Sequence, residues 1–399
     1  MNSTLHAKLS QHWTVVQAEL IPLLDAEIGP VSTPLLTIVR VIEWIEIENF
    51  ITHLPCGMGR PLEDRATLAR AFIAKTILRL PTAIALIERL QMDRALQRIC
   101  GFDLRKALPS ESTFSRAFDE MAKGEVALRC HAAFIQFHLG DQLICHITRD
   151  GTAIEARERP ASRHPRRATS IDLTVKPAQK EITVPETAVV AATPAAVKTA
   201  SAKPKRGRPK KGEVRPEPEV SRLEKQRTQS LAQMMKDLPT QCDRGSKCNA
   251  QGYKNSWNGY KLHLDVADGG IPISVILTSA SVHDSQVAIP LATMTAQRVT
   301  NCYDVMDAAY CSKEIHAHSI ELGHAPLIDH NPRGGVKRLF DYAETVRYKI
   351  RTQSERANAR LKDEFGADKI FVRGDVKVMS HLMFGVLALT VDQMFRLLT

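Results

Sequence analysis

The stretch YKIRTQSERANARLK, residues 348–362, decides how the rest of the chain is interpreted. Its chemically active side chains, Tyr348, Arg351, Glu355 and Lys362, follow the spacing Y-x2-R-x3-E-x6-K. If the stretch is one α-helix, offsets of three, four and seven residues place all four side chains on one stripe. Such a stripe suits a metal ion beside phosphates, because the acid can bind the metal while the cations and the hydroxyl hold phosphates. The plain alternative is a solvated helix with an Arg–Glu pair, worth only a few tenths of a kcal/mol.

Two further acids lie upstream, each next to a predicted strand. The run from Leu143 to Thr148 is rich in β-branched residues and predicts a strand. Asp150 lies at the far end of this strand and is followed by Gly151. The alternative for this pair is an Asp-Gly turn, which is the usual role of that dipeptide.

The second acid is Asp307, which follows the predicted strand at residues 301–306 and precedes a helix expected to begin near Ser312. Asp304 competes with it, but the two would point to opposite faces of a strand. Asp307 is preferred because it meets the loop, whereas Asp304 lies inside the strand. Carboxylates at strand ends lie at the sheet edge where ligands usually bind.

Together, Asp150, Asp307 and Glu355 can converge on two Mg²⁺ ions, with Mn²⁺ as a substitute. Mg²⁺ prefers oxygen ligands and keeps waters and substrate phosphates in its shell. Two ions about 4 Å apart activate the attacking oxygen and stabilise the leaving one in phosphoryl transfer.

The three acids, taken with Tyr348, Arg351 and Lys362 around the glutamate, resemble the DDE-type bacterial insertion-sequence transposases that carry a Y-R-E-K signature. The segments at 259–264 and 277–285 and the pair Arg373-Gly374 are similar to the same family. The resemblance covers roughly residues 143–155 and 257–399. It implies an RNase H-like α/β fold, a mixed sheet flanked by helices, after an all-helical N-terminal domain. Within the matching segment, His283 and Asp284 are expected to cap the helix that starts near Ser285.

The resemblance also implies an activity. The three acids would bind the metals and catalyse hydrolysis and strand transfer, while Tyr348, Arg351 and Lys362 would hold DNA phosphates. The expected partner is double-stranded DNA, both the terminal repeats of the element and its target, bound by a homodimer on paired ends. The expected location is the cytoplasm, in association with the nucleoid.

The positive charge of the chain is concentrated in one segment. Residues 157–211 hold fourteen Lys and Arg against four acids, an excess equal to the net charge of +10 of all 399 residues. From about residue 160 to 219 large apolar residues are few and no period is sustained, which predicts a disordered insert. Within it, KPKRGRPKK at 203–211 resembles an AT-hook, in which Arg206 and Arg208 would lie in a narrow A·T minor groove. The alternative is a basic linker that binds phosphates without sequence preference.

The predicted domains follow from these observations. Residues 1–139 form a helical domain that binds DNA ends, residues 140–158 and 235–399 form the catalytic domain, and residues 159–234 form the mostly disordered insert. Predicted helices in the first domain cover 10–24, 33–50, 65–80, 82–99 and 111–123. The last two could form a helix-turn-helix, although ordinary helical packing explains them as well and their connection is long for that motif.

Several classes of protein are disfavoured. The eight cysteines show no C-x2-C pair and predict reduced thiols. The apolar stretch at 378–398 is interrupted by polar residues and predicts a buried helix instead of a membrane span. No signal peptide is expected, and no Gly-rich phosphate loop indicates a nucleotide cofactor. The remaining rivals are an RNase H-like nuclease or resolvase without strand transfer, and a catalytically silent DNA-binding relative.

Overall fold

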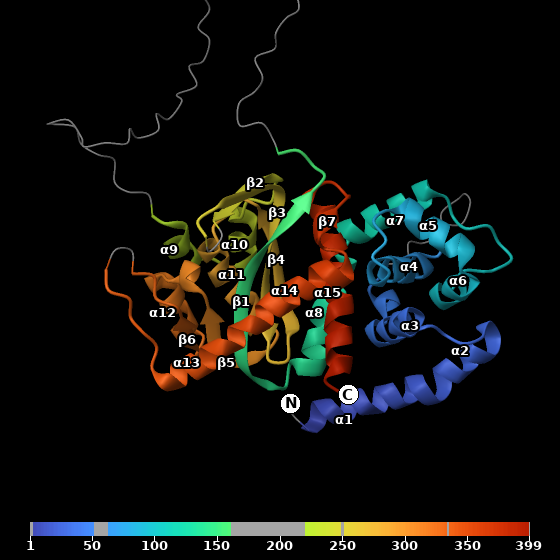
Figure 1. Ribbon diagram of the computed structural model, residues 1–399, viewed down its shortest axis with the longest axis horizontal. Helices are drawn as coiled ribbons and strands as arrows, with labels where there is room; N and C mark the ends of the chain where they lie inside the picture. The colour runs from blue at the N-terminus through green and yellow to red at the C-terminus, as the bar shows by residue number, and fades with distance from the viewer. Residues whose placement is uncertain (1–2, 52–62, 161–219, 249–250, 333–334, 399) are drawn as a thin grey trace, which may run out of the picture. The chain divides into compact units, whose positions relative to one another are not determined.

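The computed structural model describes residues 3–51, 63–160, 220–248, 251–332 and 335–398, coloured along the chain in Figure 1. The AT-hook-like segment, with Arg206 and Arg208, lies outside these residues, as does most of the predicted insert. The described part of that insert contains the short helix α9 (Arg222–Gln226), and a second short helix, α10 (Leu231–Asp237), crosses its predicted end at residue 234. Each helix is begun by a serine in a capping box.

The chain before residue 140 is helical, as predicted. Its helices are α1 (Ser3–Val15), α2 (Ile21–Ile28), α3 (Thr33–Ile45), α4 (Arg65–Ile77), α5 (Ala83–Met92), α6 (Arg94–Cys100), α7 (Glu111–Lys123) and α8 (Val126–Leu139). The predicted helix at 82–99 is divided because Asp93 leaves the helical region and caps α6 through the backbone N–H of Leu96. The chain then runs from Gly101 to Ser110 before α7 starts. This connection exceeds the three- or four-residue turn of a helix-turn-helix.

A mixed seven-stranded sheet follows, and it fits an RNase H-like α/β fold. Its strands are β1 (Leu143–Ala156), β2 (Asp243–Cys248), β3 (Lys254–Ala267), β4 (Ile271–Ser279), β5 (Thr300–Met306), β6 (Ala325–Ile328) and β7 (Lys369–Ile370). The central strand β1 pairs antiparallel with β3 and parallel with β5. On the outer sides, β4 pairs antiparallel with β3, and β6 pairs parallel with β5.

Strand β1 is longer than predicted. It continues from Leu143 to Ala156, so Asp150 lies in its middle and Gly151 continues the strand without a turn. Its first part is paired with β5 through Arg149, whereas its pairing with β3 extends to Glu155. Asp150 therefore lies where the parallel partner ends and the antiparallel partner continues.

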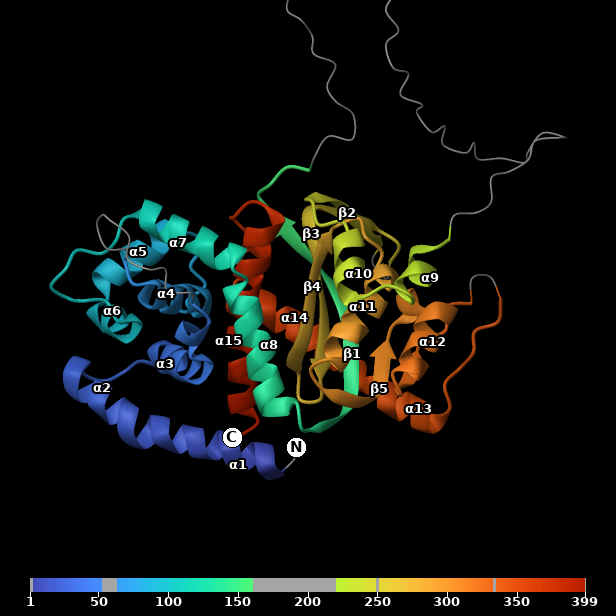
Figure 2. The ribbon, with the colours of Figure 1, turned by 180° about the vertical axis from the view of Figure 1, so that it is seen from behind.

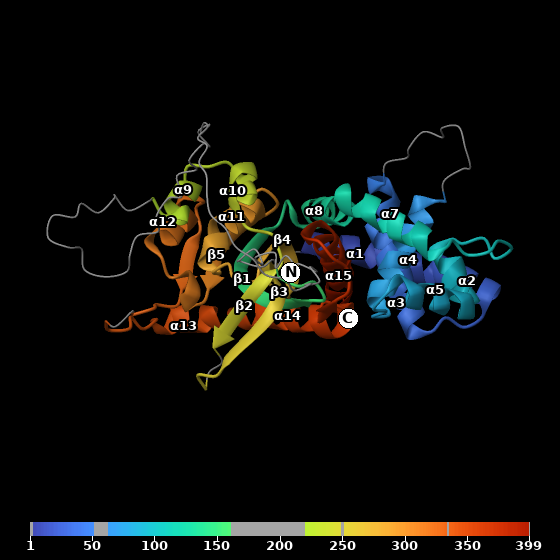
Figure 3. The ribbon, with the colours of Figure 1, turned by 90° about the horizontal axis from the view of Figure 1, so that it is seen from above.

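Helices cover both faces of the sheet. The described helices of this part are α11 (Ser285–Ala296), α12 (Lys313–Glu321), α13 (Tyr342–Tyr348), α14 (Thr352–Phe365) and α15 (Asp375–Arg396). Helices α10 and α11 lie on one face, seen in Figure 2, and α14 crosses the other, seen in Figure 1. The view in Figure 3 separates the two faces and shows the hairpin of β2 and β3 extending past the sheet on the side of α13 and α14.

The predicted single helix at 348–362 is wrong in one respect. Helix α13 ends at Tyr348, a 3₁₀ turn spans Lys349–Arg351, and α14 begins at Thr352. The backbone nevertheless stays right-handed at Tyr348, Arg351 and Thr352, so the chain keeps one direction of winding. The cause of the tighter turn is local hydrogen bonding, in which the N–H of Thr352 donates to the carbonyl oxygens of Lys349 and Ile350.

Helix α15 links the helical region to the sheet. It packs against α3, α4, α7 and α8 as well as α14 and β4, within one hydrophobic core. By length and composition it is the one helix among the described residues that could cross a membrane, but 78% of its most apolar stretch is buried inside the protein. It is thus a core helix, as predicted.

Candidate active site

Asp150 and Asp307 lie on neighbouring strands. The parallel register of β1 and β5 pairs Arg149 with Met306, so the next residue on each strand is an aspartate. Asp307 follows the last residue of β5 and caps a short 3₁₀ turn by accepting the N–H of Ala309 at 2.9 Å. Ser312 caps α12 as the sequence predicts, by accepting the N–H of Ile315. The pairing of two strands far apart in sequence thus sets the two carboxylates at one edge.

Both aspartates lie in surroundings that resist ionisation. Burial raises the pKa of Asp150 to about 6, and nearby Asp307 and Asp284 raise that pKa further. Burial also raises the pKa of Asp307, helped again by Asp284. Lys247 on β2 opposes both shifts, and Arg351 opposes that of Asp307, but together they do not cancel them. Buried acids that raise each other's pKa form a place where a bound cation is stabilised.

Helix α14 and the 3₁₀ turn before it bring further polar side chains close to Asp150. Asn358 is buried, and its Nδ2 donates to Asp150 Oδ2 at 3.0 Å. Arg351 lies close enough to Glu355 and Asp150 for both carboxylates to raise its pKa. Asp150 also favours the charged form of Lys362. Asn358 continues the stripe of Arg351, Glu355 and Lys362. The sequence alone does not reveal the role of Asn358, because an asparagine in a polar helix has no distinguishing pattern.

Glu355 is oriented differently from the two aspartates. Its carboxylate accepts a hydrogen bond from Arg351 Nη2 at 2.6 Å, and 49% of its side chain is exposed. Among the residues that the structure describes, no group of three His, Cys, Asp or Glu side chains lies close enough to hold a metal ion. Asp150 and Asp307 are therefore brought together, while the third predicted acid pairs with its neighbour on the helix.

Tyr348 is held by other side chains. Its ring contacts Phe340 with centroids 4.9 Å apart, and the Arg351 guanidinium lies 5.9 Å from its centroid. Burial raises the pKa of Tyr348 to about 12, so the phenol keeps its proton at neutral pH and can donate a hydrogen bond.

Asp284 is an acid of this site whose position the sequence analysis interpreted wrongly. It is the first residue before α11, but its side chain makes no capping hydrogen bond. The adjacent His283 accepts the N–H of Ser285 instead. The Asp284 carboxylate lies 2.9 Å from Lys261 Nζ and faces the buried His263 at 3.9 Å. An ion pair across the sheet has displaced the expected cap.

Asp304 has a structural role. It is buried within β5 and contacts Asn301 Nδ2 at 3.2 Å and His324 Nδ1 at 3.2 Å. A second buried pair lies beside Asp150, where Arg149 donates two hydrogen bonds of 2.7 Å to Asp265 on β3. The Arg149–Asp265 pair fixes β1, which carries Asp150, against β3, since a charged pair with fork geometry restricts orientation. The contacts of Asp304 hold β5, which Asp307 follows.

An RNase H-like sheet with acids at neighbouring positions of two central strands is typical of enzymes that act on phosphodiesters. Residues 226–391 match the family model Transposase DDE domain, and residues 24–120 match Transposase domain (DUF772). No curated protein and no solved structure matches the chain significantly.

Both matches are to transposase domains, and together they support a DDE-type insertion-sequence transposase. The DDE domain implies nucleotidyl-transferase or endonuclease activity, a DNA substrate and the use of divalent metal ions. The DDE match contains Asp307 and Glu355 but begins after Asp150, which joins them through the pairing of β1 with β5.

Proposed function

We propose that the protein binds the ends of its own insertion sequence, cleaves them in a metal-dependent reaction, and transfers the freed strand to a target. The observation that carries this proposal is the register of β1 and β5, which sets Asp150 beside Asp307 under the stripe of α14. We further propose that two subunits act on paired ends and that the protein works in the cytoplasm on nucleoid DNA.

The donor chemistry of the site fits a hard divalent cation. Asp150 and Asp307 offer carboxylate oxygens in buried surroundings that raise both pKa values, and a bound cation would reverse this effect. Glu355 would complete the set after leaving Arg351, a movement that its exposure permits. Mg²⁺ is the proposed ion, with Mn²⁺ as a substitute. Bound there, the metal would activate the attacking oxygen and stabilise the leaving one.

The residues of the chain position the DNA around these acids. Arg351 and Lys362 flank the acids and would hold backbone phosphates, and the protonated phenol of Tyr348 would donate to a third phosphate oxygen. Asn358 donates to one oxygen of the Asp150 carboxylate and so fixes the orientation in which that carboxylate would bind the metal. Release of Arg351 from Glu355 would couple phosphate binding to the freeing of the third acid.

Cleavage of a labelled duplex that carries the terminal repeats of the element tests this function. The wild-type protein is expected to nick the terminus with Mg²⁺ but not with Ca²⁺. Asp307→Ala and Glu355→Gln are expected to abolish nicking, because each removes one metal-binding carboxylate, and to leave DNA binding intact. Gel shifts measure binding, and pre-cut ends test strand transfer.

Asp363→Asn is the matched control, since Asp363 is an exposed acid of the same helix that lies off the stripe. It should cleave as the wild type does. Cleavage retained by Glu355→Gln would sink the assignment of that residue. Tight binding without cleavage by the wild type would favour a silent DNA-binding relative.

A further inference from the structure

A hollow lined by basic side chains lies apart from the acids, between the helical region and the end of the sheet. Its volume is about 300 Å³, and its lining comes from α4, α7, α15 and the ends of β1 and β7. Four basic side chains line it, namely Lys75, Arg157, Arg373 and Lys377. Of the described residues in this lining, only Glu111 is acidic. The hollow therefore carries an excess of positive charge.

Lys75 is the unusual member of this set. It lies on α4 and is only 8% exposed. Burial lowers its pKa to about 8, and no nearby acid offsets that effect. In the part of the chain that the structure describes, its ammonium group has no ion-pair or hydrogen-bond partner. A largely buried cation without a partner costs stability, and an anion bound in the hollow would supply the missing partner.

The surroundings of Lys75 strengthen any charge interaction. The aromatic side chains of Phe72, Phe114, Phe118 and Phe384 wall the hollow. Phe72 and Phe118 lie with ring centroids 5.0 Å apart, which closes this wall. In such low-dielectric surroundings an ion pair is stronger than in water. Lys377 is held at the rim by Asp119 at 3.0 Å, whereas Arg157 and Arg373 are exposed and able to turn inward.

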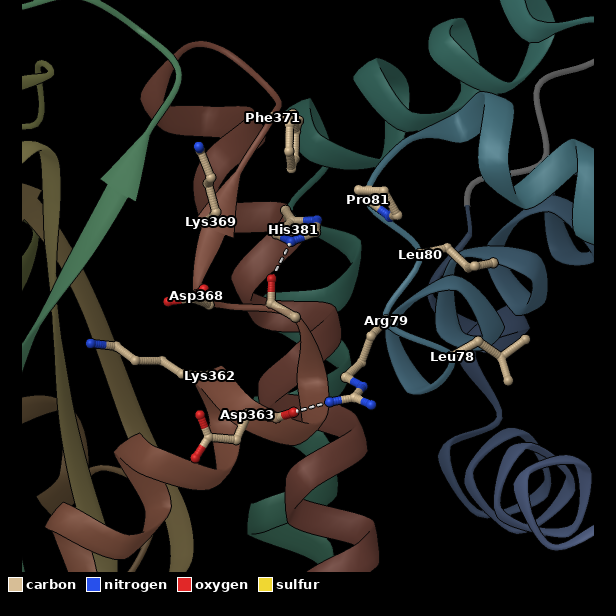
Figure 4. Close-up of a pocket in the computed structure, with 11 residues that line it drawn as sticks. Leu78, Arg79, Leu80, Pro81, Lys362, Asp363, Asp368, Lys369, Phe371 and His381 are labelled. Carbon is tan, nitrogen blue, oxygen red and sulfur yellow. Dashed lines mark hydrogen bonds between the residues drawn. The ribbon is translucent and has the colours of Figure 1, made fainter.

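The hollow adjoins a larger one that reaches the active site. That hollow, of about 590 Å³, lies between residues 78–81 and the end of α14, and it begins at Lys362 (Figure 4). Figure 4 also shows Arg79 reaching across it to the carbonyl oxygen of Asp363, at 2.7 Å. Pro81, Phe371 and His381 line both hollows. The two hollows are thus neighbours with a common wall, and a DNA backbone held at Lys362 would run close to the hollow that contains Lys75.

We propose that the hollow around Lys75 seats a phosphate group, supplied by the backbone of the DNA whose end occupies the active site. Lys75 would meet the phosphate from below, and Arg157 and Arg373 would close over it from the rim. Because the contact is to the backbone, the seat would bind without regard to base sequence. The identity of the ligand as DNA rests on the proposed function, whereas the affinity for phosphate does not.

Thermal unfolding of the full chain in inorganic phosphate, against chloride at equal ionic strength, tests the seat directly. Phosphate is expected to raise the Tm of the wild type and to leave that of Lys75→Met unchanged. Lys106→Met is the matched control, because it removes one charge from an exposed residue that lies outside the hollow and pairs only with Asp103 among the ion pairs of the described residues. It should respond as the wild type does. Equal gains in wild type and Lys75→Met, or no gain in the wild type, would overturn the proposal.

Arg373→Ala provides a second variant in case Lys75→Met alters folding, since Arg373 is exposed. It is expected to reduce the Tm gain from phosphate, and an undiminished gain would contradict its role in the seat.

The affinity of a DNA duplex, measured over a range of salt, distinguishes the source of the phosphate. The slope of log K against log salt is negative, and loss of one backbone contact in Lys75→Met should reduce its magnitude by about 0.9. A phosphate-dependent Tm gain with an unchanged slope would overturn the DNA assignment and identify a seat for a free phosphate compound. Neither readout uses cleavage, so failure of the seat is distinguishable from failure of the proposed transposase reaction.

Discussion

At the scale of single residues, Lys75 links pH to stability. Its pKa is about 8 in the folded protein, against an ordinary value of 10.5. The folded chain therefore releases this proton at lower pH than the unfolded chain. The cost of the buried charge is fully present below pH 8 and disappears as the pH rises towards 10.5. At 1.4 kcal/mol for each pKa unit, the cost is about 3 kcal/mol.

Replacing Lys75 with methionine should remove this cost. Lys75→Met is expected to be more stable than the wild type at pH 7, by up to about 3 kcal/mol, because the side chain keeps its length and loses its charge. The difference should shrink between pH 8 and 10.5. Urea unfolding across this range measures it. A constant difference, or a less stable variant at pH 7, would show that the ammonium group has a partner in the folded protein.

At the scale of the strand, Gly151 is required by what lies beside it. A Cβ atom at this position would meet Asp284 Oδ1 at 2.9 Å and His263 Nδ1 at 3.0 Å. The glycine thus allows β1 to run straight past the acids at full pairing with β3.

Gly151→Ala should therefore destabilise the protein by about 1–3 kcal/mol, since a methyl group must displace packed neighbours. Gly124→Ala is the control, because a Cβ there meets its nearest atom at 3.4 Å. It should change the free energy of unfolding by less than about 0.5 kcal/mol. Urea unfolding measures both effects. Equal changes in the free energy of unfolding at the two glycines would mean that a methyl group fits at residue 151 without displacing Asp284 or His263.

The same strand explains what the sequence could and could not predict. Asp307 was placed correctly at the end of β5 because the predicted strand at 301–306 stops there, a pattern visible in one segment. The length of β1 was underestimated because Asp150-Gly151 is typical of a turn, and only β3 and Asp284, more than a hundred residues away, show otherwise. Local patterns predict the elements, whereas contacts between distant segments decide how they are used.

Side chains that act through tertiary contacts were beyond such prediction. Asn358 bonds to Asp150 across 208 residues of chain. Lys75 looks like an ordinary surface lysine in sequence, and it is buried only because α15 packs on α4. The catalytic roles of Asp150, Asp307 and Glu355 remain predictions that the cleavage assay addresses.

At the scale of the whole molecule, residues 157–211 carry the net charge and give a separate prediction. Replacing both Arg206 and Arg208 with alanine should weaken DNA binding and reduce the salt slope by up to about 1.8, at 0.9 for each lost phosphate contact. Binding of the metal ion at the acids should be unaffected, because this segment is remote from them in sequence. Unchanged affinity in a salt titration would show that the segment contributes no contact, and a loss confined to A·T-rich duplexes would support the AT-hook interpretation.

The position of β1 has a consequence for how the gene can be divided. The strand that carries Asp150 precedes residues 161–219, while Asp307 and Glu355 follow them, yet β1 is held between β3 and β5 by its hydrogen-bonded ladders. A break in the polypeptide within that segment would therefore separate the acids on the chain without separating them in the sheet. Two co-produced pieces, 1–160 and 220–399, would reassemble a shared centre that neither piece contains alone, so that transposition could be made conditional on the meeting of two gene products.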